Sequence, residues 1–191
     1  MKTERIESIL KIGADLILKY GYNNVGLNKI LETANIPKGS FYYYFNSKED
    51  FGIQVIKFYS ENSLVLLRTY LADSSKDPKE RIISFFEDMQ KIYAEREFNE
   101  GCLLGNCSLE LSDTSEAFSN SVANELSIWQ DCFERCIQEG QENNTVKKEE
   151  SAKVMSDFIL TTWQGAVLRM KSSKNTSSIT IFIKYLKMYI L

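Results

Sequence analysis

The chain has 191 residues, of which 43% are hydrophobic, so it is long enough to bury a core in one or two small domains. Its formal net charge of −3 and its isoelectric point near 5.2 argue against a protein that coats nucleic acid without sequence preference. It contains no histidine, which excludes histidine-based catalytic triads, cysteine–histidine nucleophiles and zinc sites that include histidine. The phosphate-binding loop pattern is also missing, so we expect a protein that is not an enzyme and uses no cofactor.

Only two prolines and nine glycines interrupt the sequence. Apolar residues recur with a period of about 3.6 residues over long stretches, which predicts an all-α fold of about nine helices. No apolar run approaches the roughly 20 residues that cross a bilayer. The N-terminus is charged and amphipathic, unlike a signal peptide, so we expect a cytoplasmic protein with no membrane partner.

Residues 27–34 predict a short helix with one apolar face. Asn35 follows, and asparagine tolerates the left-handed conformation that a tight turn often requires. Ile36 would fill the angle between this helix and the next. The apolar face consists of Leu27, Ile30, Leu31 and Ala34.

A second short helix is predicted from about Pro37 through Tyr44. Phe41 and Phe45 are spaced to face a core, but three consecutive tyrosines span about 200° of a helix, so at least one must face solvent or a ligand. Lysine neutralises phosphate, glycine permits close approach, and serine and tyrosine hydroxyl groups bond to phosphates or bases. The exposed side therefore suits contact with a DNA major groove, and its residues are Lys38, Gly39, Ser40, Tyr42, Tyr43 and Tyr44.

The first 51 residues resemble the DNA-binding domain of the TetR family of transcriptional regulators. Three motifs carry the resemblance: Tyr20-Gly21-Tyr22 after the first helix, Lys38 to Phe45 in the second motif helix, and Ser47-Lys48-Glu49 at the fourth helix. The chain departs from the family at Leu27, where threonine is frequent, and at Ala34-Asn35, where Ala-Gly is frequent. A phosphate contact from a hydroxyl group at position 27 is thereby put in doubt.

The resemblance implies a homodimer that binds a palindromic double-stranded DNA operator and responds to a small-molecule effector of unknown identity. Residues 1–50 carry seven Lys and Arg against six Asp and Glu, and the remaining residues carry 16 against 20. This nearly balanced charge favours DNA binding through a few specific contacts over general electrostatic attraction to DNA. By resemblance, the groove-entering residues are Lys38, Gly39 and Tyr42, the phosphate contacts are Ser40, Tyr43, Tyr44 and Lys48, and a further DNA-contact candidate is Asn28.

Six further helices are predicted. The fourth helix begins after Ser47, a natural N-cap, and a fifth begins at Asp77-Pro78, where a cap and a first-turn proline precede Glu80. The others cover residues 103–112, 115–140, 147–172 and 177–191. We assign residues 1–47 to a three-helix DNA-binding domain with the helix-turn-helix motif, and residues 48–191 to a helical ligand-binding and dimerisation domain.

The last segment, 177–191, is apolar nearly all round, which predicts a helix that is buried on most sides with a partner subunit as part of its cover. Ile179, Ile181 and Ile183 alternate as in a strand, but no second strand is available for pairing. In the TetR family the last two helices form a four-helix dimer interface, and the resemblance implies the same here.

Four cysteines lie at positions 102, 107, 132 and 136, with spacing unlike that of ordinary zinc ribbons, so we expect no metal site. Cys132 and Cys136 are explained by packing alone. Cys102 directly precedes a predicted helix, whose N-terminus favours a reactive thiolate. A TetR subgroup senses electrophiles or oxidants through a cysteine in a similar segment, and Cys102 would then be modified faster than the other three.

The body is otherwise expected to hold a ligand in an aromatic-lined cavity, as the family does. Each candidate is equally explained as ordinary core, and the lack of charged residues in the apolar stripes favours an uncharged or aromatic ligand. The candidates for ligand contact are Phe86, Tyr93, Cys102, Trp129, Phe133 and Trp163.

The sequence thus predicts a ligand-responsive DNA-binding transcriptional regulator, and we expect it to be a repressor. An electrophile- or redox-sensing repressor that acts through Cys102 is one alternative. A helical adaptor protein that does not bind DNA and uses the tyrosines as a protein-binding hot spot is an alternative of another class.

Overall fold

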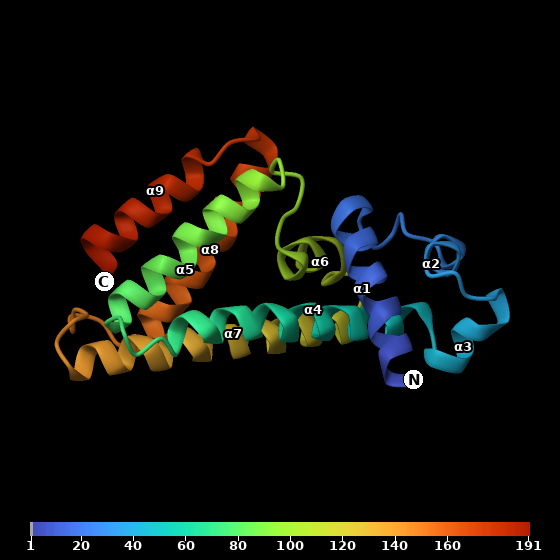
Figure 1. The fold of residues 1–191 in the computed structure, drawn as a ribbon, viewed down its shortest axis with the longest axis horizontal. Coiled ribbons are helices and arrows are strands. Elements are labelled where there is room, and N and C mark those ends of the chain that lie inside the picture. The colour runs from blue at the N-terminus through green and yellow to red at the C-terminus, as the bar shows by residue number, and fades with distance from the viewer. Residues whose placement is uncertain (1) are drawn as a thin grey trace. The chain divides into compact units, whose positions relative to one another are not determined.

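The computed structural model describes residues 2–191, apart from the side chains of Lys2, Thr3 and Lys38. All regular elements in these residues are helices, which confirms the predicted all-α fold (Figure 1). None of the described helices is long and apolar enough to cross a membrane. The elements are α1 (Lys2–Tyr20), α2 (Leu27–Thr33), a 3₁₀ turn η1 (Lys38–Ser40), α3 (Phe41–Tyr44), α4 (Lys48–Leu71), α5 (Pro78–Glu95), α6 (Leu103–Leu111), α7 (Glu116–Glu142), α8 (Ala152–Ser173), α9 (Ser177–Tyr185) and a terminal π-helix η2 (Leu186–Ile190).

The chain divides into two compact units. The N-terminal unit contains the residues up to Ser63 together with Cys102–Glu125, and the C-terminal unit contains Leu64–Gly101 and Leu126–Leu191. Helix α6 and the first part of α7 therefore belong with the helix-turn-helix segment. This division by compactness differs from the division at residue 47, and the functional boundary at residue 47 stays a prediction.

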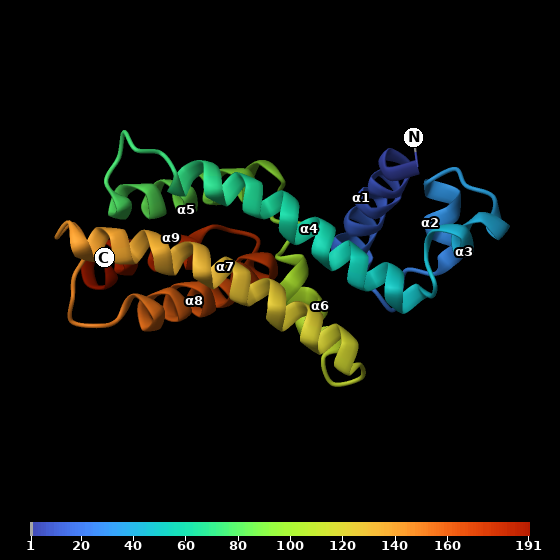
Figure 2. The same ribbon diagram turned by 90° about the horizontal axis from the view of Figure 1, so that it is seen from below.

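Three phenylalanine rings join the helix-turn-helix segment to α4, beside which α1, α2 and α3 are grouped (Figure 2). The ring centroids of Phe41 and Phe45 are 5.2 Å apart, and they lie 5.7 and 4.9 Å from the centroid of Phe51 on α4. All three rings are buried, so the predicted core role of Phe41 and Phe45 is confirmed. Helix α1 approaches at Gly13, where a Cβ atom would lie 2.4 Å from Phe51 Cζ. A larger residue at Gly13 would therefore push α1 away from α4.

The turn between the two motif helices has the predicted backbone conformation. Asn35 has a φ of 51°, in the left-handed region that asparagine adopts more readily than most residues. Arg5 of α1 donates from Nη2 to the carbonyl oxygens of Ala34, at 3.3 Å, and Asn35, at 3.0 Å. Because carbonyl groups at a helix end lack partners within the helix, this arginine satisfies them and ties α1 to the turn.

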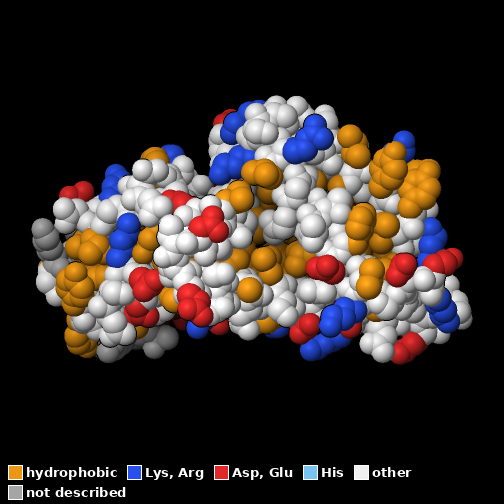
Figure 3. Space-filling view, turned by 180° about the vertical axis from the view of Figure 1, so that it is seen from behind, with side chains coloured by type: hydrophobic (Ala, Val, Ile, Leu, Met, Phe, Trp, Pro, Cys, Tyr) orange, Lys and Arg blue, Asp and Glu red, His pale blue; other side chains and the backbone are white. Residues whose placement is uncertain are grey.

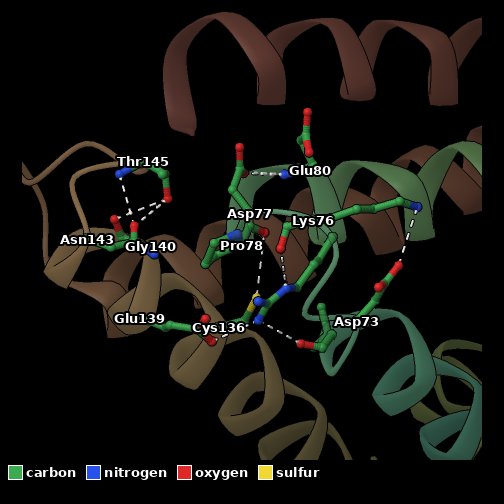
Figure 4. Close-up of polar contacts among 12 residues, drawn as sticks. Asp73, Lys76, Asp77, Pro78, Glu80, Cys136, Glu139, Gly140, Asn143 and Thr145 are labelled. Atoms are coloured by element: carbon green, nitrogen blue, oxygen red, sulfur yellow. Dashed lines mark hydrogen bonds and ion pairs between the residues drawn. The ribbon is translucent and has the colours of Figure 1, made fainter.

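Two predicted N-caps are present. The Ser47 hydroxyl group accepts a hydrogen bond from Asp50 N–H at 2.9 Å, at the start of α4. The Asp77 carboxylate accepts one from Glu80 N–H at 2.9 Å, and Pro78 occupies the first turn of α5 (Figure 4). Each cap satisfies a backbone donor that has no partner within its helix.

A buried arginine anchors the connection between α4 and α5. Arg81 is only 8% exposed, and its guanidinium group donates to Lys76 O at 2.9 Å and Leu71 O at 3.2 Å. It also forms an ion pair with Glu139 of α7, at 2.9 Å. A buried charge is stable only when it is paired and hydrogen-bonded, and Arg81 meets both conditions.

The core of the C-terminal unit is built around the ring of Phe86. Its centroid lies 5.4 Å from that of Phe133, 4.8 Å from that of Trp163 and 4.9 Å from that of Phe182. These contacts join α5 to α7, α8 and α9, and Figures 1 and 2 show α5, α8 and α9 in one group.

The C-terminal segment is helical rather than a strand, but only one face of it is buried in the single chain. It was predicted to be buried on most sides, because apolar residues surround it. The buried face consists of Ile179, Phe182, Ile183 and Leu186, and the exposed face consists of Ile181, Tyr185, Met188 and Tyr189. A long apolar face of this segment is therefore exposed to solvent in the single chain.

Candidate nucleic-acid interface

The second motif helix begins as a tighter turn than the sequence predicts. Pro37, with a φ of −58°, precedes a 3₁₀ turn at Lys38–Ser40, and one turn of α-helix follows at Phe41–Tyr44. The buried Phe41 ring fixes the orientation of this short segment, because it packs against Phe51 of α4. The side chains on the opposite side are thereby held outward.

The structure places most of the predicted DNA-contact residues at the surface. Tyr42 and Tyr43 are 67% and 66% exposed, which confirms that the three tyrosines do not all face the core. Gly39 is exposed, and a Cβ atom built there meets nothing within 4 Å. Ser40 and Tyr44 are half-buried, and Asn28 of α2 is exposed. The side chain of Lys38 lies outside the described residues.

Lys48, the first residue of α4, lies against Tyr22. Its Nζ atom donates a hydrogen bond to the Tyr22 carbonyl oxygen at 3.0 Å and lies 4.4 Å from the centroid of the Tyr22 ring. Burial lowers the pKa of Lys48, and the nearby Glu110 carboxylate opposes this change. Burial, followed by the charges of Glu49, Cys107 and Glu110, raises the pKa of Tyr22 to about 12. A phosphate contact from Lys48 was predicted from the sequence, whereas its contact with Tyr22 was not.

Glu110, near the end of α6, holds the backbone that follows α1. One carboxylate oxygen accepts a hydrogen bond from Tyr22 N–H at 2.9 Å, and the other accepts one from Asn23 N–H at 2.6 Å. Gly21 has a φ of +79°, which glycine adopts without strain and which turns the chain toward Glu110. Because hydrogen bonds to a carboxylate are stronger than those between neutral groups, α6 is firmly linked to the backbone that follows α1.

The aromatic residues proposed to line a ligand cavity are buried and in mutual contact. Phe86, Phe133 and Trp163 belong to the ring cluster of the C-terminal unit, and the Tyr93 ring centroid lies 6.1 Å from that of Trp163. Trp129 is also buried. These positions suit a packed core, and ligand contact at these residues stays a prediction.

A mostly buried glutamate on α7 was not predicted from the sequence. Glu125 is only 5% exposed, whereas the neighbouring Leu126 is half-buried. Ser121, one turn earlier, is 8% exposed. Ser121 follows Phe118 by three residues and Glu125 follows Ser121 by four. Residues with this spacing lie on one face of a helix, so the sequence contained a signal that could have predicted this burial.

The four cysteines differ in exposure. Cys102 is buried at the N-cap of α6, Cys107 and Cys136 are also buried, and Cys132 is half-buried. Burial raises the pKa of both Cys107 and Cys136 to about 12. In the part of the chain that the structure describes, no group of three or more Cys, Asp or Glu side chains is placed to hold a metal ion. Exposure therefore favours modification of Cys132 over the predicted Cys102.

An apolar groove lies between α8 and α9. It has a volume of about 600 Å³, and its walls include exposed aromatic and aliphatic side chains. Figure 3 shows hydrophobic side chains at the surface of the part of the chain that contains these helices. The main contributors are Phe158, Leu168, Ile181, Tyr185 and Tyr189.

Two family profiles match the chain. The profile described as bacterial regulatory proteins of the tetR family matches residues 9–53, and the profile described as the tetracyclin repressor-like C-terminal domain matches residues 78–186. Together they include the helix-turn-helix segment and most of the helices that follow it.

Characterised relatives are similar over most of their length. The transcriptional repressor DhaR of Mycobacterium sp. (strain GP1) is 32% identical over 93% of this chain and 87% of that protein. The transcriptional regulator AcuR of Cereibacter sphaeroides is 30% identical over 86% of this chain and 75% of that protein. The repressor NemR of Escherichia coli K12 is 27% identical over 88% and 85% of the two chains.

Solved structures share the fold. A regulatory protein TetR from Rhodobacter sphaeroides superposes with a TM-score of 0.90 and 28% identity, over 96% of this chain and 97% of that chain. The reduced form of E. coli NemR superposes with a TM-score of 0.89 and 25% identity, over 98% and 97% of the two chains.

The first prediction concerns the carboxylate of Glu110. A Glu110→Gln variant keeps an acceptor for one N–H group and presents a donor to the other, so we expect it to lower the free energy of unfolding by about 1 to 3 kcal/mol. Hydrogen exchange should accelerate at the Tyr22 and Asn23 amides. Asp113→Asn, at an exposed site after α6, is the matched control. Equal exchange at both amides in Glu110→Gln and the wild type would contradict the assigned contact.

The second prediction concerns the thiol groups. With iodoacetamide at pH 8, Cys107 and Cys136 should stay unlabelled in the folded protein, because a pKa of about 12 leaves almost no thiolate. Cys132 should be labelled first, because it is the most exposed. Mass spectrometry of partially labelled protein gives the order. Labelling of Cys102 ahead of Cys132 would reverse this expectation and support the electrophile-sensing alternative.

Proposed function

Since this chain belongs to the TetR family of bacterial transcriptional regulators, we propose that it is a homodimeric repressor that releases a palindromic DNA operator when a small molecule binds the body. The observation that carries this proposal is the exposed tyrosine face of α3 within a segment that matches the family's DNA-binding domain. The three relatives named above are transcriptional regulators, and two of them are named as repressors. A cytoplasmic location is part of the proposal, because the proposed DNA partner of a bacterial regulator lies in the cytoplasm.

In this proposal the 3₁₀ turn and α3 enter the major groove. Tyr42 and Gly39 lie at the surface, where a tyrosine edge reaches bases and a glycine lets the backbone approach closely. Tyr43 presents a hydroxyl group to a phosphate. Lys48 stays a phosphate candidate, because an ammonium group has three N–H donors and the Tyr22 carbonyl accepts from one of them. The remaining candidates keep their proposed roles: Lys38 enters the groove, Ser40 and Tyr44 contact phosphates, and Asn28 is a further DNA-contact candidate.

Two copies are needed to bind two half-sites. The apolar groove between α8 and α9 is the surface that we propose for dimerisation, because exposed apolar patches of this kind mark interfaces. A stable homodimer buries about 800 Å² on each partner. The same contact would cover the face of the C-terminal segment that the single chain leaves open.

Release of DNA follows from the link between α6 and the DNA-binding helices. Two recognition helices must be separated by about one turn of DNA, roughly 34 to 36 Å, or a multiple of it. An effector that favours another position of α6 displaces the backbone at Tyr22 and Asn23, because both N–H groups are bonded to Glu110. The DNA-bound arrangement is then disfavoured, and affinity for the operator falls.

Electrophile or oxidant sensing through Cys102 is a second candidate for the releasing signal. Its support is the similarity to NemR, whose solved structure is described as a reduced form, and the place of Cys102 at the N-cap of α6. Its burial is the observation against it. A modification at this position would add volume to a packed region and displace α6 directly.

DNA binding is tested with a duplex that the purified protein selects from a randomised pool. Tyr42→Ala should lower discrimination between the selected and scrambled duplexes by roughly 1 to 3 kcal/mol, because a base contact is lost. Tyr43→Phe should weaken binding to all duplexes alike, because phosphate contacts carry no sequence information. Tyr20→Ala, at another exposed tyrosine of the same unit, is the control. If no duplex is enriched from the pool, the adaptor alternative replaces the proposal.

Dimerisation is tested by placing a charge in the apolar groove. Tyr185→Glu should yield a folded monomer, because Tyr185 is 54% exposed in the single chain and a buried carboxylate would disrupt the interface. Lys184→Glu introduces the same side chain at an exposed neighbouring site and should leave the dimer intact. Sedimentation and circular dichroism provide the readout. A Tyr185→Glu protein that stays dimeric would rule out this groove as the interface.

A further inference from the structure

Helix α4 begins with a lysine, although the start of a helix does not favour a positive charge. Lys48 is its first residue, and Glu49 and Asp50 follow. Unpaired N–H groups give the start of a helix a partial positive charge, which stabilises acidic side chains and opposes basic ones. The helix therefore gains nothing electrostatically from Lys48, and the contacts of this side chain must explain its position.

The two acidic neighbours of Lys48 are bonded elsewhere. The Asp50 carboxylate accepts hydrogen bonds from Asn46 N–H at 2.8 Å and from Gln54 Nε2 at 3.0 Å. The Glu49 carboxylate accepts one from the Ser115 hydroxyl group at 2.6 Å. These bonds give both carboxylates partners other than Lys48.

Lys48 is held by Tyr22 in two ways. Its Nζ atom donates a hydrogen bond to the Tyr22 carbonyl oxygen at 3.0 Å. The same atom lies 4.4 Å from the centroid of the Tyr22 ring, within the range of a cation–π interaction. An ammonium group has three N–H donors, and the carbonyl oxygen accepts from one of them, so Lys48 can bond to Tyr22 and to a further acceptor at once.

Tyr22 is itself a rigid support. It is 8% exposed, and its ring centroid lies 4.9 Å from that of Phe118. A Cβ atom at Gly52 would lie 2.6 Å from Tyr22 Cε2, so the ring rests closely against α4. The Tyr22 N–H group is bonded to Glu110 at 2.9 Å. The Glu110 carboxylate also opposes the lowering of the Lys48 pKa by burial, and so favours the ammonium form that binds a phosphate.

A lysine that is held in advance binds an anion at a smaller entropic cost. The free lysine side chain has four rotatable bonds and loses much rotamer freedom when it is fixed. A side chain that is already ordered in the unbound protein loses less of this freedom on binding, so more of the contact energy appears as affinity.

We propose that Tyr22 is a positioning residue for DNA binding, whose ring and carbonyl oxygen hold the Lys48 ammonium group ready for a backbone phosphate. The inference rests on the proposed function of a DNA-binding regulator and assigns to Tyr22 a role that acts through Lys48. Because phosphate contacts carry no sequence information, Tyr22 raises the affinity for all duplexes alike.

Two other roles of Tyr22 predict different results. If Tyr22 serves packing alone, loss of its ring changes DNA affinity equally whether or not Lys48 is present. If Tyr22 competes with phosphate for Lys48, loss of its ring strengthens DNA binding. Only the positioning role predicts weaker binding that depends on Lys48.

The test is a double-mutant cycle on the full-length protein, with affinities measured by fluorescence anisotropy for the selected and scrambled duplexes. Tyr22→Leu should weaken binding to both duplexes roughly 10-fold when Lys48 is present. In a Lys48→Met background the same substitution should change affinity by less than about 2-fold. Tyr22→Phe keeps the ring and should bind as the wild type does.

Tyr20→Leu is the matched control, because Lys19 Nζ lies 5.3 Å from the centroid of the Tyr20 ring in a second pair of the same kind. Its effect should be equal in the Lys48 and Lys48→Met backgrounds. The proposal is overturned if Tyr22→Leu weakens binding equally in both backgrounds, or if it strengthens binding.

A measurement on the unmodified protein keeps the proposal testable if Tyr22→Leu does not fold. In the NMR spectrum, the Tyr22 ring current should shift the Lys48 Cε methylene protons upfield of those of the exposed Lys11. Equal shifts for the two lysines would refute the positioning role. If the wild type binds no duplex, the proposed regulator fails and this role fails with it, whereas binding without coupling to Lys48 refutes only the role of Tyr22.

Discussion

The backbone of Tyr22 is held from two sides, and the position of the DNA-binding helices depends on it. Its N–H group donates to the Glu110 carboxylate of α6, and its carbonyl oxygen accepts from the Lys48 ammonium group of α4. Charge-assisted hydrogen bonds are short and directional, so neither α6 nor α4 can shift far without moving this segment. The partial burial of Lys48, which lowers its pKa, fits a group that belongs to this junction as well as to the protein surface.

The recognition surface is short, and a rigid core supports it. One turn of α-helix is too short to be stable by itself, so the order of α3 comes from the packing of Phe41 and Phe45 against Phe51. The left-handed turn at Asn35, tied to α1 by Arg5, sets the direction from which α3 departs. Exposed tyrosines on such a support offer large contact surfaces with little loss of side-chain entropy on binding.

Two exposed surfaces of the chain correspond to two of the proposed partners. The exposed hydroxyl groups and rings of α3 suit a DNA groove, and the apolar face of α8 and α9 suits a second copy of the chain. Elsewhere polar groups are paired within the chain, as the hydrogen bonds of Arg81 and the N-caps Ser47 and Asp77 illustrate. The two surfaces that the single chain leaves exposed are therefore the ones that the proposed function assigns to DNA and to a second copy of the chain.

The sequence alone determined the features that depend on neighbouring residues. The left-handed Asn35, the caps of α4 and α5, the core positions of Phe41 and Phe45, and the helical character of the C-terminal segment all follow from local conformational preference and periodicity. Only the tertiary structure decided the contacts between distant residues. Glu110 and Tyr22 are 88 positions apart, and nothing in either local pattern predicts their bond. Burial of Glu125 and exposure of one face of α9 were likewise decided by packing, because helical periodicity indicates which residues share a face but not which neighbours cover it.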